Sequence, residues 1–122
     1  MTTWTIRLPW TAPPLSLNDR GHWRGRARLI RMVRNDSTTL ARAARVPQCE
    51  HIHIQLIYIP RDSRRRDPEN LIATQKALID GLVPLVVPDD TPQYVSWSPP
   101  IIAPADPKDP HLRLEITRKE AP

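Results

Sequence analysis

The chain has 122 residues, a formal net charge of +5 at pH 7 and 39% hydrophobic residues. This length allows one domain with one modest core. The basic excess favours an anionic partner. The single cysteine excludes an internal disulfide framework and a cysteine-based zinc site. No apolar run approaches 18 residues and no signal-peptide core is present near the N-terminus, so we expect a cytoplasmic protein with no membrane partner.

The first half of the chain predicts two strands separated by a helix. Residues 3–8 alternate with period two and predict a strand that ends at Pro9. A weak apolar stripe predicts a helix over residues 25–45, which residues 35–37 could interrupt. Residues 51–59 alternate again and predict a second strand. His51 and His53 share a face of this strand, which would permit a metal site, but no third ligand is evident beside them. We therefore interpret them as solvent-facing histidines.

Arginine dominates the predicted first helix, where Asp36 is the one acidic residue between positions 21 and 45. Guanidinium groups pair bidentately with phosphate oxygens, so this helix is a candidate phosphate-binding surface. The alternative is a solvated amphipathic face. The candidate DNA contacts on this helix are Arg24, Arg26, Arg28 and Arg31.

A second helix is predicted after a short basic loop. Pro68 favours the first helical position, which makes Asp67 the expected N-cap of a helix that ends near Leu82. The apolar residues 71, 78 and 82 are spaced so that they bury one side of this helix. The run Arg64-Arg65-Arg66 directly precedes the cap and supplies further candidate DNA contacts.

Acidic side chains recur along this helix and after it. At about 100° per residue, Glu69, Lys76 and Asp80 fall on one stripe. Asp89-Asp90 follow at a distance from which the chain can return them to the start of the helix. Carboxylate oxygens suit Mg²⁺ or Mn²⁺, so we predict a divalent-metal site. The structural alternative is a helix cap, a favourable dipole charge and a surface ion pair.

The remainder of the chain predicts two more strands. Residues 81–87 form a short apolar connection, residues 93–97 a strand, residues 99–110 an irregular loop, residues 111–117 a last strand, and residues 118–122 a polar tail. The order β-α-β-α-β-β predicts a single α+β domain over residues 1–122, with a small mixed or antiparallel sheet and both helices packed on it.

These motifs resemble the RusA family of Holliday-junction resolvases, compact endonucleases common in phages and prophages. The resemblance extends in order over nearly the whole chain. The matching segments are Leu8-Pro9-Trp10, Arg64-Arg65-Arg66, Asp67-x-Glu69-Asn70-Leu71, Lys76-x-x-x-Asp80-Gly81-Leu82 and Asp89-Asp90.

The resemblance implies that Asp67, Glu69 and Asp90 are catalytic, metal-binding carboxylates, and Asp89 is a further candidate ligand or orients the others. The chain departs from the family pattern at Glu69, where the family has Asp. It also departs in the lysine that follows the Asn of the motif by about three residues. Lys76 is one helical turn later and is the expected catalytic counterpart.

We therefore expect a Mg²⁺-dependent endodeoxyribonuclease, with Mn²⁺ as a substitute and no organic cofactor. The resemblance implies a homodimer that resolves four-way DNA junctions by paired symmetric nicks. Two alternatives remain open. One is a catalytically impaired protein that binds branched DNA, and the other is a nuclease that acts on flaps or other branched DNA.

Overall fold

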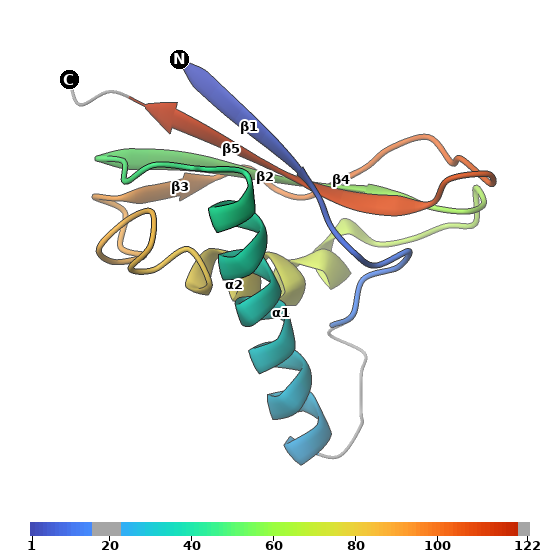
Figure 1. Ribbon diagram of the computed structural model, residues 1–122. Coiled ribbons are helices and arrows are strands. Elements are labelled where there is room, and N and C mark those ends of the chain that lie inside the picture. The colour runs from blue at the N-terminus through green and yellow to red at the C-terminus, as the bar shows by residue number, and fades with distance from the viewer. Residues whose placement is uncertain (16–22, 120–122) are drawn as a thin grey trace.

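The computed structural model describes residues 1–15 and 23–119, in which a five-stranded mixed sheet carries the helices on one face (Figure 1). The structure confirms the predicted α+β fold. The helices are α1 (Trp23–Ala43) and α2 (Ile72–Asp80), and a single 3₁₀ turn, η1 (Pro68–Leu71), precedes α2. The strands are β1 (Thr2–Arg7), β2 (His51–Ile59), β3 (Val95–Trp97), β4 (Ile101–Ile102) and β5 (His111–Lys119).

The two long strands form the centre of the sheet. The strand order is β1-β5-β2-β3, and β4 pairs with β2 beyond the end of β3. β5 is antiparallel to both β1 and β2, whereas β3 and β4 are parallel to β2. Alternate residues of β2 and β5 are buried beneath the helices, as their period-two patterns predict. These core residues are Ile52, Ile54, Leu56, Leu112, Leu114 and Ile116.

Two predictions for the C-terminal part of the chain are wrong. Arg118 and Lys119, expected in a polar tail, belong to β5 because they pair with Thr2 of β1 and His51 of β2. The proline-rich segment 99–110, expected to be irregular throughout, contains β4, which pairs with residues 57 and 58 of β2. The rest of the predicted tail, residues 120–122, lies outside the described residues.

α1 is continuous across residues 35–37, where an interruption was considered. The Ser37 side chain is buried and donates a hydrogen bond of 2.6 Å to the carbonyl oxygen of Leu78. Thr38 Oγ1 donates to the carbonyl oxygen of Gly81 at 2.5 Å. Both hydroxyl groups therefore satisfy carbonyl groups at the C-terminal end of α2 and join the helices.

The second helix is shorter than predicted and begins differently. Asp67 is the N-cap, as expected, and its Oδ1 accepts a hydrogen bond of 2.9 Å from the Glu69 amide. The next turn is 3₁₀, and the Ile72 amide bonds to the Glu69 carbonyl three residues back. A 3₁₀ turn rotates by roughly 120° per residue, against about 100° in an α-helix, so the angle between Glu69 and the α2 residues Lys76 and Asp80 differs from the predicted one.

The N-terminal half of α1 extends past α2 and away from the sheet (Figure 1). Among residues 24–43 of α1, the buried side chains are Val33, Ser37 and Ala41, all from the midpoint of the helix onward. Among residues 24–32 no side chain is fully buried. We call this segment, residues 24–32, the basic arm. Neither described helix is long and apolar enough to span a membrane.

Candidate metal and nucleic-acid site

Lys76 lies between two carboxylates that come from different parts of the chain. Its Nζ is 4.0 Å from Asp80 Oδ1, one turn further along α2, and 3.9 Å from Asp90 Oδ2, in the loop before β3. The returning chain is anchored by a 2.8 Å hydrogen bond from the Cys49 amide to the Val86 carbonyl. This anchor brings Asp90 beside the middle of α2. We call Lys76, Asp80 and Asp90 the charged cluster.

The Asp80 carboxyl is the most perturbed acid of the charged cluster. Burial raises the pKa of this carboxyl above its ordinary value. The Lys76 ammonium opposes that shift, and the neighbouring Asp90 carboxylate adds to it. A carboxyl group whose pKa is raised by burial and by a neighbouring carboxylate lies where a cation would be favoured.

The other predicted carboxylates lie around the start of η1. Asp67 and Asn70 line a pocket of about 690 Å³, together with Arg65, Arg66 and Tyr58. Glu69 is exposed to solvent. Asp89 is also exposed, and its Oδ1 accepts a 2.8 Å hydrogen bond from the Asp90 amide, which orients the backbone of Asp90.

The structure thus divides the predicted metal ligands between two places. Asp67 faces the pocket of about 690 Å³, whereas Asp90 lines a smaller pocket with Lys76. Within residues 1–15 and 23–119, no three side chains of acidic, histidine or cysteine type converge closely enough to hold a metal ion. Asp80, which was predicted to share a stripe with Glu69 and Lys76 but was not among the predicted metal ligands, is the acid that the structure places beside Asp90.

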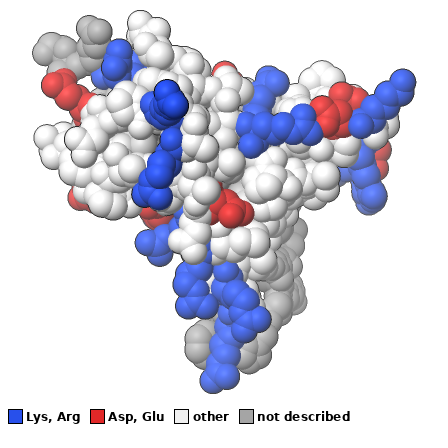
Figure 2. All heavy atoms as spheres, viewed as in Figure 1, with Lys and Arg blue, Asp and Glu red and all other residues white. Residues whose placement is uncertain are grey.

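Basic side chains cover the arm that projects beside the charged cluster. Figure 2 shows Lys and Arg side chains along the projecting end of the molecule, where Figure 1 draws the start of α1. Arg24, Arg28 and Arg31 are exposed on this arm, and Arg26 is half-buried. Arg26 lines a hollow of about 180 Å³ between the helices that Lys76 and Asp80 also line. The hollow therefore connects the basic arm to the charged cluster.

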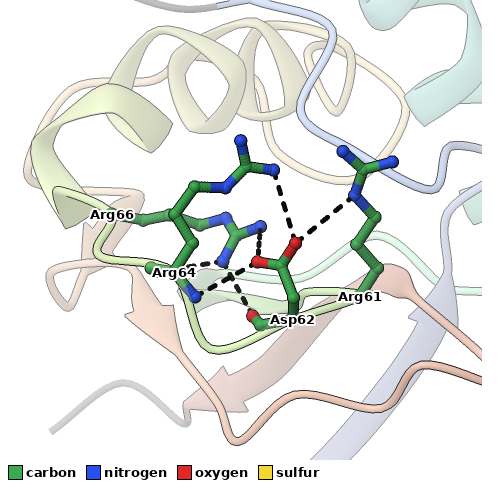
Figure 3. Close-up of polar contacts among 4 residues, drawn as sticks. All are labelled: Arg61, Asp62, Arg64 and Arg66. Carbon is green, nitrogen blue, oxygen red and sulfur yellow. Dashed lines mark hydrogen bonds and ion pairs between the residues drawn. The ribbon is translucent and has the colours of Figure 1, made fainter.

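The second predicted basic segment, the loop after β2, is organised by one acid. Asp62 lies among Arg61, Arg64 and Arg66 (Figure 3). Arg66 Nη2 donates to Asp62 Oδ1 at 2.7 Å, and Arg66 Nη1 donates to the carbonyl oxygens of residues 62 and 64. The hydrogen bond from the Arg66 side chain to the Asp62 carboxylate is the main reason that the pKa of Asp62 lies below its ordinary value.

The three arginines predicted to contact DNA in this loop are therefore not equivalent. The Arg66 side chain is 18% exposed, and its guanidinium lies 5.7 Å from the centre of the Tyr58 ring. Arg66 therefore fixes the conformation of the loop through its hydrogen bonds to residues 62 and 64. Arg64 is exposed but pairs with Asp62 at 3.4 Å. Arg65 is exposed and lines the same pocket as Asp67, and in the described chain it makes no ion pair. Arg65 is the best placed of the three to meet a phosphate.

The two histidines of β2 lie on the sheet face away from the helices, but they are hydrogen-bonded. His53 Nδ1 and Nε2 each lie 2.7 Å from a hydroxyl group, those of Ser96 and Ser98. His51 Nε2 lies 3.1 Å from the same Ser96 hydroxyl. The prediction that both histidines lie on the outer face of the sheet is therefore correct. Both side chains are nevertheless half-buried, and they form hydrogen bonds with the serine hydroxyl groups.

Sequence reasoning missed the position of Asp80 beside Asp90 and the role of Asp62 in the basic loop. A signal for the first was present, because the Lys76-x-x-x-Asp80 spacing places both side chains on one helix face. Comparison of the chain with models of known protein families and with curated proteins found no match.

Proposed function

We propose that this protein is a Mg²⁺-dependent endodeoxyribonuclease of the RusA type that resolves four-way DNA junctions. The observation that carries the proposal is the charged cluster. It places Lys76 within 4.0 Å of two carboxylates and adjoins a projecting arm of arginines. A polyanion bound by the arginines of the basic arm would place a phosphate beside the acidic residues of the charged cluster.

The available donors are chemically suited to a divalent metal. All the candidate ligands are carboxylates, and Mg²⁺ is commonly held by one or two carboxylates with water and substrate phosphate completing its coordination. Asp90 would be the central ligand, with Asp80 beside it. Asp67, which lines a separate pocket, Glu69 and Asp89 are the other candidates. When bound, the ion would polarise a phosphoryl oxygen and lower the pKa of an attacking water.

The protein side chains contribute positioning and charge. Lys76 is 72% exposed, and its two ion pairs are long, so they hold the ammonium weakly. The ammonium is therefore free to turn toward a phosphate and to stabilise negative charge that develops there. Exposed arginines of the basic arm, with Arg65, would bind neighbouring phosphates without reading bases.

Junction preference would then arise from shape and symmetry. A four-way junction is two-fold symmetric, and a homodimer of this chain would place two identical sites on opposed strands. Backbone contacts fix the orientation of such a complex on the DNA without sequence information.

The test is cleavage of a labelled four-way junction in Mg²⁺ and in EDTA, with a linear duplex and a flap substrate alongside. We expect paired, symmetric nicks on the junction that EDTA abolishes. Tight junction binding without cleavage in Mg²⁺ or Mn²⁺ would contradict the enzyme and favour a DNA-binding protein. Cleavage of the flap in preference to the junction would contradict the substrate.

Substitution at Asp67 sharpens this test. Asp67→Asn removes a proposed ligand and one negative charge, so we expect cleavage to be lost while junction binding is unchanged or tighter. Glu115→Gln is the matched control, because Glu115 lies on β5, where its neutralisation leaves the proposed ligands intact. Equal loss of binding and cleavage in Asp67→Asn would argue against a catalytic role for this residue.

A further inference from the structure

A small pocket opens between α2 and the edge strand β3, beside the charged cluster. Its volume is about 230 Å³, and its apolar walls are formed by Ile72, Ile79, Val95 and Trp97. The Trp97 side is open, since this residue is 50% exposed, and Ile72 at the other wall is 37% exposed. A concave apolar surface with a few polar groups marks a candidate ligand or partner site.

Gln75 supplies a polar group within these apolar walls. It is 2% exposed, and its Oε1 accepts no hydrogen bond from any part of the chain that the structure describes. Gln75 shares one face of α2 with Ile72 and Ile79, at the spacing of three and four residues that aligns helical side chains. Burial of an amide oxygen without a partner destabilises a protein. Because no bond holds this oxygen, the amide can turn into the pocket without losing one.

We propose that this pocket, the Gln75 pocket, receives one unpaired nucleobase that carries an exocyclic amino group. The base would stack on Trp97, and its amino group would donate a hydrogen bond to Gln75 Oε1. The inference rests on the proposed function, because it takes DNA as the ligand. It assigns to the chain a base-reading site next to the proposed site of cleavage.

The dimensions and surroundings of the pocket favour a single base. Its volume is below the roughly 300–1,000 Å³ of pockets for drug-sized ligands, so the occupant is small. Stacking of a base on an exposed aromatic ring is a common way to bind unpaired nucleic acid. Lys76 and Asp90 line the same pocket. A base seated there would keep its own phosphate close to the charged cluster.

The unpaired oxygen of Gln75 favours a base as the occupant of the pocket over an apolar side chain from a second copy of the protein. An apolar side chain would leave Gln75 Oε1 unpaired, whereas an amino group would satisfy it. Adenine and cytosine present such a group, and thymine has none. The pocket therefore predicts that junction cleavage depends on the base beside the cut, although phosphate contacts dominate the affinity.

The test measures binding of labelled single-stranded homopolymers of dA, dC and dT by fluorescence anisotropy in EDTA. We expect dA and dC to bind about tenfold more tightly than dT. Gln75→Leu should abolish this preference, and it should fold because it replaces an unpaired amide with an apolar group. Trp97→Ala should weaken binding of all three homopolymers about tenfold. Ile101→Ala is the control, since Ile101 is an exposed apolar residue on the same sheet edge outside the pocket.

Three results would overturn the inference. One is equal affinity of the unsubstituted protein for dA, dC and dT. A second is a Trp97→Ala variant that keeps its affinity for the homopolymers but sediments as a smaller species, which would make the pocket an interface between copies. The third is junction cleavage without base preference. The first two results are separable from failure of the proposed function, because binding is measured without metal. Junction cleavage without base preference would overturn the inference alone.

Discussion

Lys76 Nζ lies 3.9 Å from Asp90 Oδ2, so a lysine in the middle of α2 meets an acid that follows the helix by a proline-containing connection. The same ammonium lies 4.0 Å from Asp80 Oδ1. The lysine therefore balances two carboxylates that would otherwise repel each other. Binding of a substrate phosphate and a cation would replace these ion pairs together. The cation would pair with the two carboxylates, and the phosphate would pair with the lysine ammonium.

The first prediction concerns the charge of Lys76. Lys76→Met keeps a long, unbranched side chain and removes its ammonium, so we expect the single-turnover rate of junction cleavage to fall about 100-fold. Junction affinity should change little, because one exposed cation among many contributes a small share of phosphate binding. Lys108→Met is the control, since Lys108 is exposed in the loop before β5. A rate equal to that of the control would remove Lys76 from the reaction.

The second prediction separates two adjacent arginines. Arg65→Ala should weaken junction binding and lower the slope of log affinity against log salt by about 1, because one phosphate contact is lost. Arg66→Ala should instead loosen the loop, because Arg66 holds Asp62 and two carbonyl groups. Hydrogen exchange of the amides of residues 61–66 should then become faster in Arg66→Ala and stay unchanged in Arg65→Ala. The opposite pattern of exchange would contradict the assignment.

The sheet was predictable from the sequence because its central strands have one buried and one polar face. Period-two alternation identified β2 and β5 and the residues that face the core. The predicted cap at Asp67 is also correct, because Asp followed by Pro is a specific helix-start signal. The 3₁₀ form of the next turn was not predictable, because the same cap and proline begin an α-helix equally well.

The arrangement of the candidate site depends on contacts that no local pattern encodes. The position of Asp90 follows from the path of residues 81–90, which has no periodicity and is held by the amide of Cys49. The difference between Arg65 and Arg66 follows from the positions of Asp62 and the Tyr58 ring. Gln75 reads as an ordinary polar helical residue, and only its burial reveals an oxygen without a partner.

The third prediction concerns the close approach of the two helices at Gly81. A Cβ atom at this position would lie 2.3 Å from the Arg34 carbonyl oxygen and 2.7 Å from Ser37 Cβ, so the helices would have to separate. Gly81→Ala should lower the free energy of unfolding by about 3 kcal/mol, as other overpacked cores do. Urea denaturation followed by circular dichroism measures this change.

Gly25 provides the matched control for Gly81. Among the described residues, a Cβ atom at Gly25 would have no neighbour within 4 Å outside its own helix, and this residue lies in the first turn of α1. Gly25→Ala should leave the free energy of unfolding unchanged or raise it by about 0.5 kcal/mol, because alanine is the better helix former. Equal effects of the two substitutions would show that the helices do not approach closely at Gly81.

The fourth prediction concerns the pH dependence of stability through His53. Burial lowers the pKa of His53 below its ordinary value, and the positive charge of Lys119 and the neighbouring His51 lower it further. A group with a lowered pKa in the folded state contributes stability above its unfolded pKa of about 6.5. This contribution is lost as the pH falls through the lower pKa of the folded state.

The urea concentration at the midpoint of unfolding should therefore decrease as the pH is lowered from 7.5 to 5.5. His53→Gln should reduce this decrease, because glutamine can bond to the serine hydroxyls but does not titrate in this range. His111→Gln is the control, since His111 begins β5 at the far end of the pairing with β2. A pH dependence that His53→Gln leaves unchanged would mean that protonation of His53 does not oppose folding. The row of hydrogen bonds with Ser96 and Ser98 would then accept the charged imidazole as readily as the neutral one, because each hydroxyl can act as donor or acceptor.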